Sequence, residues 1–263
     1  MRVTQADIDL AARLADAAGA AIRPYFRAPH GVETKADGSP VTLADRAAEA
    51  AMRRLLDAEA PGDGVVGEEY GEKPGVTGRR WVLDPIDGTH SFTAGRAIFG
   101  TLIALLVDDW PLLGVIDQAI QHERWIGVVG RGTTLGGVPT RTRACAALPG
   151  SILATSSPHY FAETDGPRFL SLVAATASGR MGPLYGGDCY NYGLLASGHL
   201  DLVCESGLKL HDFAALVPVV EGAGGRMCDW RGDPLTADST GDVLAIGDPA
   251  RVDDVLEAMG TIV

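Results

Sequence analysis

The sequence of 263 residues has few basic residues for its length. Its 22 lysines and arginines stand against 34 aspartates and glutamates, which gives a formal net charge of −12 at pH 7. Nucleic acid and anionic membranes are bound through a basic face, so we expect neither of these partners. An anionic small molecule would need bound divalent cations, because metals held by carboxylates reverse the local sign of the charge.

Cysteine pairs and long hydrophobic runs are also absent. The four cysteines are scattered without a Cys-x-x-Cys pair, and we interpret them as reduced thiols, most of them in the core. No apolar stretch approaches the ~20 residues of a membrane span. The N-terminus lacks the basic region and apolar run of a secretion signal. These absences predict a cytoplasmic protein with no membrane partner.

Apolar residues make up 46% of the chain, enough for an extensive core. Apolar spacing of three and four residues predicts a helix over 4–26, and Thr42 is placed to cap a second helix. Short apolar runs between 64 and 129 predict neighbouring antiparallel strands, whereas strands and helices alternate in the later part. This change of rhythm predicts a boundary between an N-terminal half, 1–142, and a C-terminal half, 143–263. From the motifs and the resemblance described below, we expect the first half to carry most metal ligands and the second to select the substrate. We expect 29–40 to be a loop.

The segment Asp84 to Thr89 is the strongest sign of chemistry. The residues before it predict a strand that ends at Asp84, and the next residue, Pro85, stiffens the exit. We expect Asp84 and Asp87 to lie on one tight turn, with the carbonyl of Ile86 beside them. Such an oxygen-rich corner suits Mg²⁺. The alternative is a simple solvated turn, since Asp, Pro and Gly dominate turns.

The same segment is also expected to open a short helix. Its first backbone N–H groups, from Gly88, Thr89 and His90, would then face an anion such as phosphate. Metal and phosphate would meet at one turn.

Three further acids extend this site. Glu68 follows the short apolar run Val65-Val66 and lies at another predicted strand end. Asp212 opens an apolar helical stretch, where the alternative role is that of a helix cap. Asp45 lies three residues after Thr42 and, taken alone, would be a carboxylate of the first helical turn.

Four motifs together resemble the inositol monophosphatase-like magnesium phosphatases. They are Trp81 to Thr89, Asp212 to Ala215 with Glu221 to Gly225, Lys35 to Asp45, and Gly67 to Glu69. The resemblance implies an α/β (α+β) fold, a layered α-β-α-β-α sandwich, with a homodimer and two or three Mg²⁺ ions per active site. It implies that the aspartate matching Asp45 hydrogen-bonds the threonine matching Thr89, which with the acid matching Glu68 positions the attacking water.

The expected site residues fall into three sets. Metal ligands are Glu68, Asp84, Asp87, Asp212 and the carbonyl of Ile86; catalytic residues are Glu68, Thr89 and Asp45; substrate-binding residues are Gly88, Thr89, His90, Gly187, Asp188, Cys189 and Glu205.

The choice of phosphate ester depends on Asp188. Inositol phosphatases usually carry a small neutral or hydroxyl residue there, whereas a carboxylate prefers a cation such as the ammonium or imidazolium of histidinol phosphate. Gly186 to Tyr190 resembles the histidinol-phosphate phosphatases of the superfamily, which act in histidine biosynthesis. The alternatives are an N-terminal helix cap at Asp188, an inositol-1-monophosphatase, and a broad-specificity sugar or nucleotide phosphatase. We expect a peripheral role for His90 and no metal role for His211.

Overall fold

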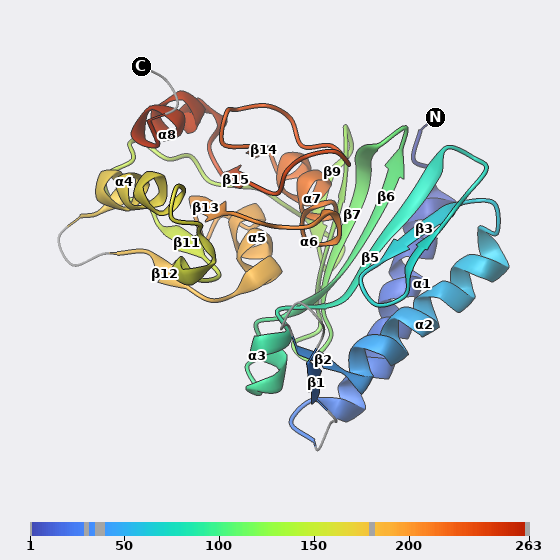
Figure 1. The fold of residues 1–263 in the computed structure, drawn as a ribbon. Coiled ribbons are helices and arrows are strands. Elements are labelled where there is room, and N and C mark those ends of the chain that lie inside the picture. The colour runs from blue at the N-terminus through green and yellow to red at the C-terminus, as the bar shows by residue number, and fades with distance from the viewer. Residues whose placement is uncertain (1, 29–31, 35–39, 179–181, 261–263) are drawn as a thin grey trace.

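A computed structural model of the protein describes residues 2–28, 32–34, 40–178 and 182–260. Its helices and sheets form five layers, α-β-α-β-α, which run from right to left in Figure 1. The layered α/β fold expected from the sequence is therefore confirmed. Among the described helices, none is long and apolar enough to cross a membrane.

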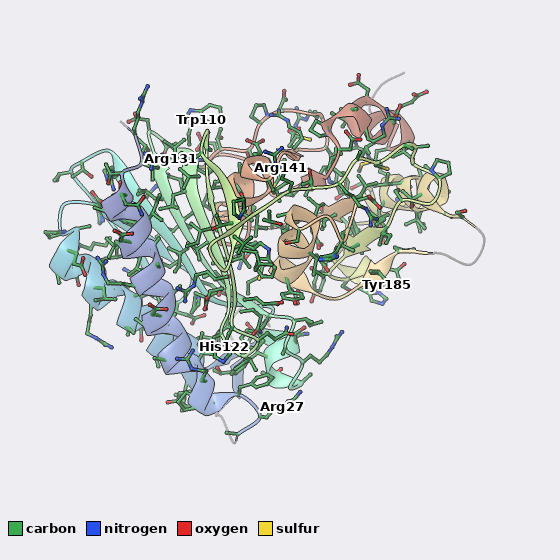
Figure 2. The ribbon with its side chains drawn as sticks, turned by 180° about the vertical axis from the view of Figure 1, so that it is seen from behind. Arg27, Trp110, His122, Arg131, Arg141 and Tyr185 are labelled. Carbon is green, nitrogen blue, oxygen red and sulfur yellow. The ribbon has the colours of Figure 1, made fainter. Side chains whose placement is uncertain are left out.

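The first layer consists of α1 (Gln5–Ile22) and α2 (Leu43–Glu59), which lie side by side on one face of the large sheet. Figure 2, seen from behind, shows α1 along this face. Thr42 caps α2 as predicted, because its hydroxyl accepts a hydrogen bond from the Ala44 N–H at 3.1 Å.

The second layer is an eight-stranded sheet of order β10-β9-β8-β7-β6-β5-β3-β4. Val107 and Trp110 pair across a two-residue turn in which Asp108 and Asp109 both have positive φ, the geometry of a tight hairpin. All the pairs are antiparallel except β3 with β5, so the predicted succession of hairpins is confirmed. The strands are β3 (Gly64–Gly67), β4 (Gly71–Lys73), β5 (Arg79–Asp87), β6 (Gly100–Val107), β7 (Trp110–Gln118), β8 (Glu123–Val128), β9 (Gly132–Leu135) and β10 (Val138–Thr140).

The remaining layers are built from later residues. Helices α5 (Asp188–Ala196), α6 (Leu210–Phe213) and α7 (Leu216–Gly222) lie between the two sheets, and α4 (Gly166–Thr176) and α8 (Val252–Ala258) cover the outer face of the smaller sheet. That sheet has the order β12-β11-β13-β15-β14. Its strands are β11 (Leu153–Thr155), β12 (Leu184–Tyr185), β13 (Leu202–Glu205), β14 (Arg226–Cys228) and β15 (Val243–Ile246).

The structure differs from the sequence expectations in two segments. The expected loop over 29–40 contains the strand β1 (Val32–Thr34), which pairs with β2 (Pro40–Thr42). The helix expected from His211 to Glu221 is divided into α6 and α7. Pro218 explains the division, because proline has no N–H for the Ala214 carbonyl and its ring crowds that carbonyl. The short helix α6 thereby ends just after Asp212.

Candidate active site

A cleft of about 510 Å³ lies where the end of β5 meets the start of α5 and the loop before α6. It brings together residues that are far apart in the sequence. The predicted site residues that line it are Glu68, Asp87, Gly88, Thr89, His90, Asp188, Cys189, Glu205 and Asp212.

The end of β5 differs from the tight turn that the sequence suggested. The strand continues through Pro85 to Asp87, and its pairing with β6 shifts register between Asp84 and Asp87. The Thr101 hydroxyl donates to the Pro85 carbonyl at 2.8 Å, which supports the chain where proline has no N–H to offer. The bulge keeps both aspartate side chains near one point, as a turn would have done.

Four carboxylates meet at the cleft, and we call Glu68, Asp84, Asp87 and Asp212 the carboxylate cluster. One oxygen from each of Asp84, Asp87 and Asp212 lies within 4.8 Å of the others. Burial raises the pKa of Asp84 well above its usual range, and the charges of Glu68, Asp87 and Asp212 raise it further. Burial, Asp188 and Asp212 do the same for the pKa of Asp87. Without a cation, the ionised cluster is electrostatically unfavourable.

The donor set fits a hard divalent cation. In the described part of the chain, no arginine or lysine forms an ion pair with Asp84 or Asp87, so no protein cation there offsets their charge. Carboxylate oxygens are the ligands that Mg²⁺ prefers. The carboxylate cluster can therefore hold metal ions.

Asp212 acts as a cap and as a member of the cluster. One of its oxygens accepts the Lys209 N–H at 2.7 Å, which satisfies a donor at the start of α6. An oxygen of the same carboxylate belongs to the group with Asp84 and Asp87. Asp212 thus caps α6, as the alternative reading of the sequence expected, and also belongs to the carboxylate cluster.

The segment after β5 forms α3 (Thr89–Thr93), the short helix that the sequence predicted. Gly88 precedes it with φ of 86°, and a Cβ there would lie 2.6 Å from an oxygen of Asp188. Only glycine allows both this conformation and this close approach.

The hydrogen bond expected between Asp45 and Thr89 is not formed. The Thr89 hydroxyl donates its one proton to the Ile86 carbonyl at 3.1 Å. Asp45 instead accepts the Thr42 N–H and hydroxyl at 2.7 and 2.6 Å through one oxygen. Its other oxygen is buried and has no partner among the described residues. The capping contact therefore replaces the expected link.

Asp45 nevertheless lies close to the acids of the site. Burial, with smaller contributions from the charges of Glu69 and Glu68, raises the pKa of Asp45 to about 6. Part of its motif, residues 35–39, lies outside the described residues.

Asp188 does not cap α5. Asp188 is the first residue of the helix. The capping position before it is occupied by Gly187, which has no side chain that could form a capping bond. The Ser91 hydroxyl donates to the Asp188 carboxylate at 3.3 Å, and Asp188 has φ of 44°. Burial raises the pKa of Asp188, while the hydrogen bond from Ser91 and the charges of His90 and Arg96 oppose that shift. Arg96 forms no ion pair with Asp188 within 4.0 Å in the described chain.

Cys189 joins the two halves of the site through its backbone. Its N–H donates to the Asp87 carboxylate at 2.6 Å, across 102 positions of sequence, while its side chain is buried. Gly187 is buried beside Asn191 and is not among the described residues that line the cleft. Both residues position the start of α5.

Glu205, at the end of β13, is almost fully buried and faces the cleft. It accepts hydrogen bonds from the Thr155 hydroxyl at 3.1 Å and from the N–H and hydroxyl of Ser156, both at 2.7 Å. Burial, supported by the charge of Asp188, raises the pKa of Glu205 to about 7 despite these donors.

The cleft also contains residues that the sequence analysis did not place there. His211 was given no metal role, yet a ring nitrogen lies within 4.8 Å of Glu68 and Asp84 oxygens. Tyr192 had one usable signal, since it follows Asp188 by four positions on a predicted helix and therefore shares its face. The other such lining residues include Ser156, Tyr160, Ser206 and Lys209.

Comparisons with known proteins identify the family of the chain. The family model for the inositol monophosphatase family matches residues 4–256. The chain is 49% identical over 234 residues to the chloroplastic bifunctional phosphatase IMPL2 of Arabidopsis thaliana, a match that covers 88% of this chain and 66% of that protein. It is 37% identical over 241 residues to a histidinol-phosphatase of Chlorobaculum parvum, covering 91% and 92%.

A solved structure is also similar to this chain in both sequence and fold. An inositol monophosphatase from Zymomonas mobilis superposes with a TM-score of 0.88 at 52% identity, covering 97% of this chain and 98% of that one. The chain therefore belongs to the inositol monophosphatase family, and it is a phosphoric monoester hydrolase.

Proposed function

We propose that the protein is a histidinol-phosphate phosphatase, which hydrolyses L-histidinol phosphate to L-histidinol and phosphate. The observation that carries this proposal is the pair Asp188 and Glu205, which line the same cleft as the carboxylate cluster without belonging to it. A phosphate ester that also carries a positive charge would have its phosphate bound at the carboxylate cluster and its cationic group bound by Asp188 and Glu205. The name of the Chlorobaculum parvum relative supports this choice.

The metal ions of the proposed reaction are two or three Mg²⁺. The carboxylate cluster would hold them, together with the carbonyl of Ile86, which has a second lone pair besides the one used by Thr89. Mg²⁺ bound there supplies Lewis acidity toward water and the phosphoryl oxygens.

Glu68 and Thr89 orient the attacking water in this proposal. Because the Thr89 hydroxyl spends its proton on the Ile86 carbonyl, its oxygen is able to accept a hydrogen bond from a water. Glu68 lines the same cleft and is able to accept the other proton. We keep Asp45 as a positioning residue, since it fixes the start of α2 beside these acids.

The phosphoryl group would lie against Gly88, Thr89 and His90, all of which line the cleft. Their backbone N–H groups lie at the start of α3, where they would face the phosphoryl oxygens. The organic part would then extend toward Asp188 and Glu205, where a charge-assisted hydrogen bond favours an ammonium or imidazolium over a neutral polyol.

Inositol-1-monophosphatase activity is the second candidate. It is favoured by the likeness to the Zymomonas mobilis structure, and the bifunctional Arabidopsis thaliana relative leaves room for more than one ester. A phosphate-release panel with histidinol phosphate, inositol 1-phosphate, fructose 1,6-bisphosphate and an adenosine bisphosphate tests the choice. The proposal requires the highest kcat/KM for histidinol phosphate. It is wrong if any of the other three is hydrolysed more efficiently.

We also propose that the protein is a homodimer. Leu184 and Tyr185 on the edge strand β12 are each about half exposed, and Tyr185 lies at the rim of the molecule in Figure 2. Exposed apolar side chains on a sheet edge favour association. Light scattering during size-exclusion chromatography should give twice the chain mass of 27.4 kDa. The cytoplasmic location stays a prediction.

A further inference from the structure

One buried hydroxyl group in the wall of the cleft has no partner. Tyr192 lies on α5, lines the cleft and is 2% exposed. Its hydroxyl makes no hydrogen bond to any residue that the structure describes. Burying a hydroxyl without a partner costs stability, so packing alone does not explain this tyrosine.

The surroundings of this hydroxyl are acidic. The charges of Glu205, Asp87 and Asp212 all act on it, and with burial they raise the pKa of Tyr192 well above its ordinary value. It is therefore a neutral phenol, able both to donate and to accept a hydrogen bond. The hydroxyl thus lies near both Glu205 and two members of the carboxylate cluster, Asp87 and Asp212.

We propose that the Tyr192 hydroxyl is a specificity-determining contact for the organic part of the substrate, beside the ester group. This inference rests on the proposed function. In histidinol phosphate, the carbon next to the ester carbon carries the ammonium group. The Tyr192 oxygen accepts a hydrogen bond from that ammonium, while its proton faces the surrounding carboxylates.

The same helix supplies a matched control. Tyr190 is two positions earlier, and its hydroxyl donates to the Glu123 carboxylate at 2.6 Å. Tyr190 does not belong to the described lining of the cleft. Tyr190→Phe thus removes a satisfied hydroxyl outside the cleft, whereas Tyr192→Phe removes an unsatisfied one inside it.

The experiment compares histidinol phosphate with the analogue in which hydrogen replaces the ammonium group. For wild type, Tyr192→Phe and Tyr190→Phe, kcat/KM is measured for both esters with saturating Mg²⁺. We expect the ratio of the two kcat/KM values to fall about tenfold in Tyr192→Phe, as for loss of a hydrogen bond to a charged group. The ratio should stay at its wild-type value in Tyr190→Phe.

Thermal melting separates binding from packing. Tyr192→Phe should melt at or above the wild-type temperature, because no hydrogen bond of the folded protein is lost, whereas Tyr190→Phe should melt lower. A melting temperature of Tyr192→Phe well below wild type would show a structural role and overturn the inference.

The kinetic outcomes distinguish this inference from the proposed function. If wild type prefers histidinol phosphate to the analogue and Tyr192→Phe keeps the same ratio, the Tyr192 contact is wrong and the proposed function stands. If wild type shows no preference for histidinol phosphate over the analogue and over inositol 1-phosphate, both are wrong.

Discussion

The carboxylate cluster and Glu205 lie at the same cleft but are stabilised in different ways. In the carboxylate cluster, Asp84 and Asp87 are buried beside other acids that raise their pKa values. Glu205, which lines the cleft outside that cluster, accepts hydrogen bonds from Ser156 and Thr155 that partly compensate its burial. The first arrangement needs a strongly charged cation, whereas in the second the protein's own donors offset part of the cost of burial. In the proposed function, the cluster carries the reaction, and Asp188 and Glu205 select the ester.

Removing one charge from the cluster should have the largest effect. We expect Asp87→Asn to lower kcat/KM for histidinol phosphate by more than about 100-fold, since even loss of a group that only supports a metal ligand costs ~10–100-fold. Phosphate release with Mg²⁺ measures it. Asp57→Asn, at a largely exposed surface ion pair with Lys73, is the control and should change kcat/KM less than about twofold. Full Mg²⁺-dependent turnover by Asp87→Asn would contradict the assignment.

Metal removal should show the repulsion directly. Protein stripped with EDTA should melt about 5–10 °C lower than protein in Mg²⁺ at about 100 times its Kd, because binding to the folded state alone stabilises it by ~2.7 kcal/mol. Asp87→Asn should melt higher than wild type without metal and gain less from Mg²⁺. Calorimetry of both proteins in both buffers provides the test. If Mg²⁺ leaves the melting temperature of the wild type unchanged, the carboxylate cluster does not hold the metal.

Outside the carboxylate cluster, a charge change at Asp188 should alter substrate preference more than turnover. Asp188→Asn should lower kcat/KM for histidinol phosphate about tenfold relative to that for inositol 1-phosphate, because a hydrogen bond to a charged group is worth ~1.5–3 kcal/mol. Steady-state kinetics with both esters measures the ratio. An unaltered ratio would remove Asp188 from substrate choice.

A separate prediction concerns pH. Because folding raises the pKa of Glu205 from 4.5 to about 7, the folded state holds its proton more tightly. Its contribution to stability is therefore complete below pH 4.5 and is lost as the pH rises through 7. In metal-free protein, the free energy of unfolding of wild type minus that of Glu205→Gln should fall by about 1 kcal/mol per pH unit in this window. Urea unfolding between pH 4.5 and 7.5 measures it, and parallel curves would contradict the shift.

Sequence reasoning succeeded where the chemistry is local. The β6–β7 hairpin and the Thr42 cap follow from short patterns, whereas the five layers were implied by the family resemblance; the structure confirms all three. The spacing of Asp84 and Asp87 brought both into one corner although the turn expected there is a bulged strand.

Short sequence patterns could not predict the contacts between segments that are distant in the sequence. The Cys189 N–H donates to Asp87 only because the fold places the start of α5 beside the end of β5. No local sequence signal predicts that the two segments are neighbours. The expected Asp45–Thr89 bond failed for a related reason, since each group found a nearer partner within three positions of sequence. Tyr192 was accessible in principle from helical spacing, but its missing partner is visible only in three dimensions.

A competition assay tests the central claim most directly. Histidinol phosphate and inositol 1-phosphate are mixed at equal concentration with the wild-type enzyme and Mg²⁺, and the initial rates of histidinol and inositol release are measured together. Their ratio equals the ratio of the two kcat/KM values. If Asp188 and Glu205 bind the substrate cation, histidinol should be released at least about ten times faster than inositol. A ratio at or below one would contradict it.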